Sequence, residues 1–145
     1  YDGLRDERIA GSFVWYPQPF GLQAEWNFGR GPGLNDAQTA VEVRPLQGGY
    51  IMPTYKIDTK RHGIVTLFSR FQHYHGGYKS IKNAPYGTHD EYSLGFEWQI
   101  FKELEVVLEY GFVNGVGLRG IDTPGEVSYR DFQGQLLRSQ IQINY

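Results

Sequence analysis

The last ten residues of the chain, 136–145, alternate between apolar and polar side chains and end on an aromatic residue. Successive side chains of a β-strand point to opposite faces of a sheet, so each parity forms one surface. The apolar parity holds Leu137, Ile141, Ile143 and Tyr145, and the polar parity holds Arg138, Gln140, Gln142 and Asn144. A closing strand of this kind is typical of a β-barrel that has lipid on one side and water on the other.

Six further segments show a similar alternation, so the predicted strands cover 8–16, 21–30, 49–57, 63–75, 91–101, 103–112 and 133–145. Most have about the 9–11 residues that a tilted strand needs to cross a bilayer. The connections 17–20, 58–62 and 102 are short, whereas 31–48, 76–90 and 113–132 are long and rich in Gly, Pro, Asn and Asp. Short turns on one side and long loops on the other indicate an all-β fold, a transmembrane antiparallel β-barrel of the bacterial outer membrane, with its short turns in the periplasm.

Composition agrees with a barrel and excludes other classes. Aromatic residues make up 16% of the chain and glycine contributes 19 residues, which suits a polar lumen between two aromatic girdles. No run approaches the roughly 18 apolar residues of a transmembrane helix. The net charge of −2 and the lack of a basic stripe give no reason to expect a nucleic-acid partner.

The number of strands bears on domain organisation. A complete bacterial barrel has an even number of strands with both termini in the periplasm. Seven strands that finish in the periplasm leave the N-terminus on the other side. We therefore expect residues 1–145 to be the C-terminal portion of one larger barrel domain, with a missed strand near residues 1–7 as the alternative.

Strand parity also predicts which side chains line a pore. Arg70 shares its parity with Phe68, and we turn Arg70 inward because an arginine facing lipid at mid-membrane costs about 2–4 kcal/mol. The predicted pore-lining residues are Glu25, Asn27, Lys56, Arg70, Gln72, Glu97, Gln99, Glu105, Glu109, Arg138, Gln140 and Gln142. This set mixes acids and bases, whereas a selective ring carries one sign. Either acids and bases pair across strands and keep the wall hydrated, or Arg70 and Arg138 form a basic track for anions.

Aromatic residues near the strand ends are predicted to anchor the barrel at the two membrane interfaces. They are Trp15, Tyr16, Phe28, Tyr92, Phe101, Phe112 and Tyr145.

Other chemistry has little support in the sequence. His73 and His75 share a parity and could hold zinc with His89 or Asp90, but solvated histidines at the mouth of a loop are the simpler interpretation. No residue is expected to be catalytic, because the mid-strand Ser69 and Ser139 have the lipid-facing parity. We predict neither a metal nor a cofactor.

Several blocks of sequence resemble the C-terminal part of the phosphate-selective porin O and P family. The resemblance is carried by LQAEWNFGRGP (22–32), GGY (48–50), RFQHYHGG (70–77), GFEWQ (95–99) and LRSQIQINY (137–145), in the family's order. It implies a roughly 16-stranded, homotrimeric porin in the outer membrane of a Gram-negative bacterium, of which this chain supplies a little under half. Phosphate selectivity in the family's best-known members comes from Arg and Lys residues of the N-terminal half, so the resemblance supports a porin more directly than a phosphate channel.

The function predicted from the sequence is passive diffusion of small hydrophilic solutes and ions, with a preference for anions such as phosphate implied by the resemblance alone. One alternative is a small closed eight-stranded barrel with a filled, salt-bridged lumen, whose loops contact surfaces or partners. A soluble lipocalin-like binder is a third class, and it requires a polar exterior and an apolar interior. The expected partners of the porin are outer-membrane lipid, small ions and further copies of the chain.

Overall fold

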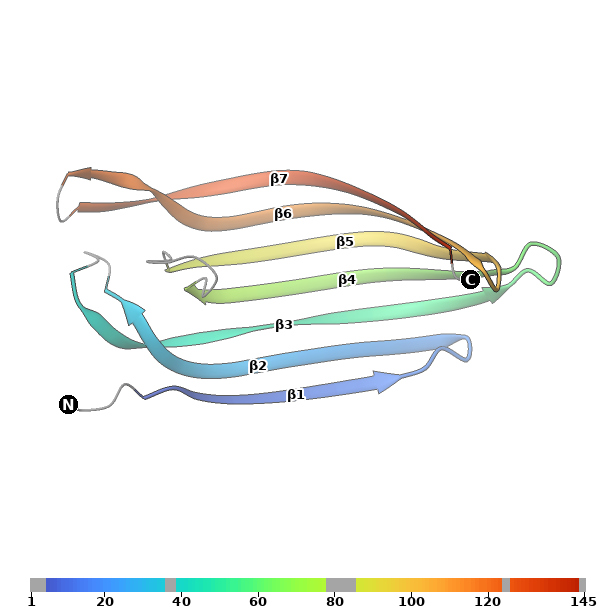
Figure 1. Ribbon diagram of the computed structural model, residues 1–145, viewed down its shortest axis with the longest axis horizontal. Helices are drawn as coiled ribbons and strands as arrows, with labels where there is room; N and C mark the ends of the chain where they lie inside the picture. The colour runs from blue at the N-terminus through green and yellow to red at the C-terminus, as the bar shows by residue number, and fades with distance from the viewer. Residues whose placement is uncertain (1–4, 36–38, 78–85, 124–125, 144–145) are drawn as a thin grey trace.

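The computed structural model describes residues 5–35, 39–77, 86–123 and 126–143. Seven strands form one antiparallel sheet and lie side by side in chain order (Figure 1). They are β1 (Glu7–Trp15), β2 (Phe20–Leu34), β3 (Val41–Asp58), β4 (Ile64–Gly77), β5 (Tyr86–Phe101), β6 (Leu104–Thr123) and β7 (Glu126–Ile143). The all-β class and the seven predicted strands are thus confirmed, in a sheet that is open, with β1 and β7 at its edges.

The sheet has two distinct ends. The turns that join β1 to β2, β3 to β4 and β5 to β6 lie together at one end, which we call the short-turn end and at which β7 also ends (Figure 1). The end of β2 and the start of β3, and likewise the end of β6 and the start of β7, lie at the opposite end, which we call the hairpin end. Within the described residues, no helix is long and apolar enough to cross a membrane.

The turn between β3 and β4 shows how the sequence closes the short-turn end. The Thr59 hydroxyl donates a hydrogen bond to the Gly63 carbonyl oxygen at 2.6 Å, and the Lys60 amide donates to an Asp58 carboxylate oxygen at 2.8 Å. Gly63 has a φ of 83°, a left-handed conformation that glycine adopts without the steric penalty of a side chain. Local polar bonds and one glycine therefore reverse the chain in few residues.

The prediction of long loops at 31–48, 76–90 and 113–132 is wrong for much of the described part of these ranges, because the strands continue into them. At the hairpin end, Gly31 pairs with Arg44 and Pro32 with Val43. Gly and Pro have low strand preferences, but each residue pair added to an existing hairpin gains cross-strand contacts, so tertiary pairing overrides local preference. The pairing of β6 with β7 becomes irregular only beyond Leu118.

Candidate functional site

Cross-strand partners share a face of the sheet, so the register assigns each described strand residue to one of two faces. From Glu91 on β5, partners lead through Gln72 and Tyr50 to Glu25 on β2. We call the face that carries these residues the polar face. The opposite face carries Tyr92 and its partners, and we call it the apolar face.

All twelve residues predicted to line a pore lie on the polar face, and their role in lining a pore stays a prediction. They come from six strands: Glu25 and Asn27 from β2, Lys56 from β3, Arg70 and Gln72 from β4, Glu97 and Gln99 from β5, Glu105 and Glu109 from β6, and Arg138, Gln140 and Gln142 from β7. Two of them are also hydrogen-bonded along their own strand: the Asn27 side-chain amide donates to the Glu25 carboxylate at 3.1 Å.

Burial is the reverse of that in a soluble protein. Among the described residues no apolar side chain is buried, and the buried polar ones are Thr54, Glu91, Ser93 and Glu109. The apolar face exposes large aliphatic and aromatic side chains instead; Leu94, for example, is 66% exposed. In water such a surface is costly, by about 25 cal/mol for each Å² of apolar area. A lipocalin-like binder needs the opposite arrangement, so the structure argues against that class.

Four charged side chains meet on the polar face, and we call Arg70, Glu91, Glu109 and Arg138 the charge quartet. Arg70 Nη2 lies 3.2 Å from Glu91 Oε1 and 2.5 Å from Glu109 Oε1. Arg138 Nη1 lies 2.9 Å from Glu91 Oε1 and 3.1 Å from Glu109 Oε2. Each arginine therefore binds both carboxylates, and the four residues connect β4, β5, β6 and β7.

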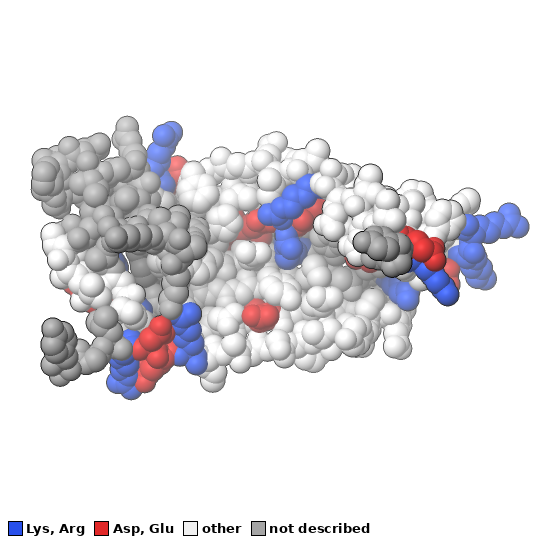
Figure 2. Space-filling model, in the orientation of Figure 1, with Lys and Arg blue, Asp and Glu red and all other residues white. Residues whose placement is uncertain are grey.

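The charge quartet has no net charge, because two guanidinium groups face two carboxylates. The carboxylates are the more buried partners: the Glu91 and Glu109 side chains are 6% and 9% exposed, against 24% and 44% for Arg70 and Arg138. Figure 2 shows charged groups of both signs meeting near the middle of this view and gathering again towards the two ends. The structure favours the paired interpretation of the wall charges, because both arginines of the predicted basic track are bound to carboxylates.

Aromatic rings lie across glycines of the neighbouring strand on the polar face. A Cβ atom added to Gly95 would come within 2.5 Å of the Phe68 ring, and one added to Gly115 within 2.6 Å of the Phe132 ring. Both contacts are on the polar face. Phe68, which shares the polar parity with Arg70, is therefore accommodated because its ring lies over the bare backbone of Gly95 on the next strand.

The border between apolar and polar side chains runs obliquely across the apolar face. On β1, apolar Ile9 precedes charged Glu7 towards the hairpin end, and the hydrogen-bonded partners of Ile9 lead strand by strand to Asp131 on β7. On β7, Leu137 is followed in that direction by the polar residues Gln135, Gln133 and Asp131, so the border moves from 131 to 137 over six strand steps. One residue per strand, with about 3.3 Å per residue and about 4.8 Å between strands, gives a tilt of roughly 35°, as in membrane barrels.

The predicted interfacial aromatics are exposed where the structure describes them, and anchoring remains their predicted role. The exposed fractions are 59% for Trp15, 73% for Tyr16, 51% for Phe28, 52% for Tyr92, 65% for Phe101 and 38% for Phe112. Tyr145 lies outside the described residues. A further aromatic, Trp98, donates its indole N–H to the His62 carbonyl oxygen at 2.6 Å and ties β5 to the turn between β3 and β4.

The histidines do not converge on one point. His73 Nδ1 lies 2.6 Å from Asp90 Oδ1, and His75 Nδ1 lies 2.9 Å from Thr88 Oγ1, both on the apolar face. His89 pairs with Tyr74 on the polar face. Within the described part of the chain, no three His, Cys, Asp or Glu residues are grouped to hold a metal.

Three members of the charge quartet, Arg70, Glu109 and Arg138, belong to the predicted pore-lining set, and Glu91 is the member that the set lacks. Parity puts Glu91 on the polar face, but its contact with Arg138 spans 47 positions and depends on the register of three strands. Ser93, 3% exposed, was also missed; it pairs with Arg70 on β4 and with Gly111 on β6. In the sequence, both residues stand on the inward-facing parity of a strand whose other parity is apolar. Their small or acidic side chains at that parity are the signal that could have found them.

The comparisons agree with the geometry. The sequence profile of a family described as phosphate-selective porin O and P matches residues 2–116. The match begins nearer the N-terminus than the blocks that carry the resemblance, and it ends within β6. No curated protein and no solved structure matches the chain.

Proposed function

The chain belongs to the phosphate-selective porin O and P family, and on that premise we propose that it forms part of the wall of a passive diffusion channel for small hydrophilic solutes. Membership supports a porin-type channel of the outer membrane and not an enzyme. The polar face lines the water-filled lumen, and the apolar face contacts lipid.

One observation carries this proposal: the described residues bury carboxylates and hydroxyls and expose their large apolar side chains. That arrangement is stable only where lipid covers the apolar face. The backbone hydrogen bonds are made between neighbouring strands, so the sheet can lie in hydrocarbon wherever its edges are also paired. Residues 1–145 supply the C-terminal portion of such a barrel, in which partner strands complete the edges at β1 and β7.

The solute class follows the family description. We propose a preference for anions such as phosphate, supported by family membership alone. The charge quartet is neutral, so at its height the wall formed by β4 to β7 adds no excess of positive charge. Selectivity then depends on other residues of the lumen, and the quartet holds four strands in register.

The family also suggests the assembly and the location. We propose a homotrimer in the outer membrane of a Gram-negative bacterium, with the short-turn end in the periplasm and the hairpin end outside. A small closed barrel with a plugged lumen would also contain a neutral ion-paired cluster. Membership in a family of porins favours the open channel over that alternative.

The proposal is tested by single-channel recording with the intact protein that carries this chain. Stable conductance steps in a planar bilayer under a KCl gradient support the channel, and the sign of the reversal potential gives the preferred ion. Titration of phosphate then tests the solute, because a phosphate site reduces the chloride current in a saturable way. A preparation that inserts into the bilayer and never conducts would favour the plugged barrel.

A further inference from the structure

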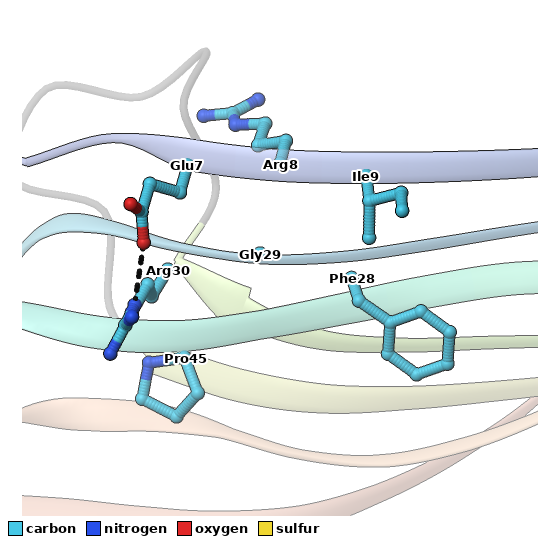
Figure 3. Close-up of a pocket in the computed structure, with 7 residues that line it drawn as sticks. All are labelled: Glu7, Arg8, Ile9, Phe28, Gly29, Arg30 and Pro45. Carbon is cyan, nitrogen blue, oxygen red and sulfur yellow. Dashed lines mark hydrogen bonds and ion pairs between the residues drawn. The ribbon is translucent and has the colours of Figure 1, made fainter.

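A hollow of about 400 Å³ opens on β1, β2 and β3 near the hairpin end. Glu7, Ile9, Phe28, Arg30 and Pro45 project from the apolar face around it (Figure 3). The remaining lining residues, Arg8 and Gly29, are paired with each other and have the parity of the polar face. The hollow is thus a feature of the surface that faces away from the charge quartet.

The hollow straddles the border between apolar and charged side chains. Ile9 and Phe28 are paired across β1 and β2, and they are 71% and 51% exposed. Two residues further towards the hairpin end, Glu7 and Arg30 form the next pair on the same face. In a membrane this border lies at the level of the lipid headgroups, where aromatic and long basic side chains concentrate.

The charged side of the hollow has one excess positive charge. Glu7 accepts a hydrogen bond from Arg5 Nε at 2.6 Å and from Arg30 Nε at 2.9 Å (Figure 3 draws the second). These bonds, from Arg5 first and from Arg30, hold the pKa of the Glu7 carboxyl below its usual range, so Glu7 is ionised at neutral pH. A guanidinium group has five N–H donors, and one shared carboxylate leaves donors free on both arginines.

The neighbours of the hollow leave its mouth open to lipid. Phe28, Arg30 and Pro45 belong to β2 and β3, which are paired on both sides. Ile9 belongs to the edge strand β1, but its side chain projects from the apolar face and not along the edge. A strand added beside β1 would therefore lie next to Ile9 and would not cover it.

We propose that this hollow binds a phosphorylated lipid of the outer leaflet. The acyl chain lies against Ile9, Phe28 and Pro45, and the phosphate accepts hydrogen bonds from Arg5 and Arg30. Guanidinium groups suit this role because their planar N–H fork matches phosphate oxygens in pairs. The site goes beyond the channel function but uses the proposed orientation, with the hairpin end outside.

The probe is a fluorescent phosphatidic acid, titrated into the intact protein in a neutral detergent, with a fluorescent diacylglycerol of the same chain length as the comparison that lacks the phosphate. We expect saturable binding of phosphatidic acid and at least about tenfold weaker binding of diacylglycerol, since the charge-assisted hydrogen bonds to the phosphate are lost. Inorganic phosphate at equal concentration should not displace the probe, because it lacks the acyl chain. Displacement by inorganic phosphate would overturn a lipid site in favour of a site for the free ion.

Two substitutions should move the affinity in opposite directions. Arg30→Gln removes a phosphate donor and weakens binding about tenfold, whereas Glu7→Gln removes the competing carboxylate and strengthens it. Arg61→Gln, in the turn at the short-turn end, is the matched control and should leave the affinity unchanged. Equal affinities for all three variants would overturn the proposal.

Conductance separates this proposal from the channel. All three variants should conduct as the parent protein does, because none of the three residues belongs to the predicted pore-lining set. If the variants conduct normally and Arg30→Gln does not change the affinity for the lipid, the lipid site alone is overturned. Selective lipid binding by a protein that never conducts overturns the channel and leaves the lipid site standing.

Discussion

Arg138 on β7 reaches past β6 to Glu91 on β5, and its Nη1 atom lies 2.9 Å from Glu91 Oε1. The direct cross-strand partner of Arg138 is Glu109, which also accepts a hydrogen bond from it at 3.1 Å. Since Arg70 binds the same two carboxylates from β4, the contact closes a neutral group of four charges over four strands.

Neutrality of the charge quartet predicts how ion preference responds to substitution. Arg138→Gln leaves one excess negative charge on the polar face and should shift the reversal potential under a KCl gradient towards cations. Glu91→Gln leaves one excess positive charge and should shift it towards anions. The double variant Glu109→Gln/Arg138→Gln restores neutrality and should return close to the parent value. Shifts of the same sign in both single variants would contradict a role for quartet charge.

A new charge should destabilise the protein much more on the apolar face than at the same height on the polar face. Leu108 lies on the apolar face in the middle of the apolar part of β6, and the adjacent Val107 lies on the polar face between Glu97 and Gln140. Leu108→Arg should lower the free energy of unfolding in lipid vesicles by about 2–4 kcal/mol. Val107→Arg is the matched control, with an expected loss within about 1 kcal/mol. Equal losses, measured by urea unfolding, would contradict the assignment of faces.

The contact between Phe68 and Gly95 predicts a packing limit. A Cβ atom at Gly95 would lie 2.5 Å from the Phe68 ring and 2.5 Å from the Leu108 carbonyl oxygen, so both must shift. Gly95→Ala should destabilise the protein by about 1–3 kcal/mol through overpacking. Gly134→Ala is the control, because an added Cβ there meets no atom within 4 Å. If both variants lose the same free energy of unfolding, the loss comes from the conformation of the strand and not from the contact with the ring.

The oblique border predicts which residues share a depth in the membrane. The chain contains no cysteine, so spin labels on Phe28→Cys, Tyr92→Cys and Leu137→Cys need no background substitution within it. On the apolar face each of these three positions is followed, towards the hairpin end, by a polar residue (Arg30, Asp90 and Gln135), and relaxation measurements should place their labels at similar depths. The alternative is that depth follows the cross-strand partners, which lead from Tyr92 through Phe112 to Gln135. In that case a label at Gln135 will lie at the same depth as one at Tyr92, and the label at Leu137 will lie deeper.

Alternation of side chains was enough to predict the strands and their faces, because period two is a local property of extended backbone. The extent of the hairpins was not predictable in this way. Pro32 and Gly31 suggest a loop, and they are held in strand only by partners on β3. The charge quartet was also beyond local reasoning, since Arg138 and Glu91 become neighbours only when β5, β6 and β7 are in register.

Cysteine accessibility along β7 distinguishes side chains that face a water-filled lumen from side chains that face lipid. Single cysteines at 137–142 in the intact protein are exposed in a planar bilayer to a membrane-impermeant, charged thiol reagent while current is recorded. We expect Arg138→Cys, Gln140→Cys and Gln142→Cys to react and change the current, whereas Leu137→Cys, Ser139→Cys and Ile141→Cys should do neither. Reaction at every position, or at the second set alone, would contradict a water-filled lumen on the polar face.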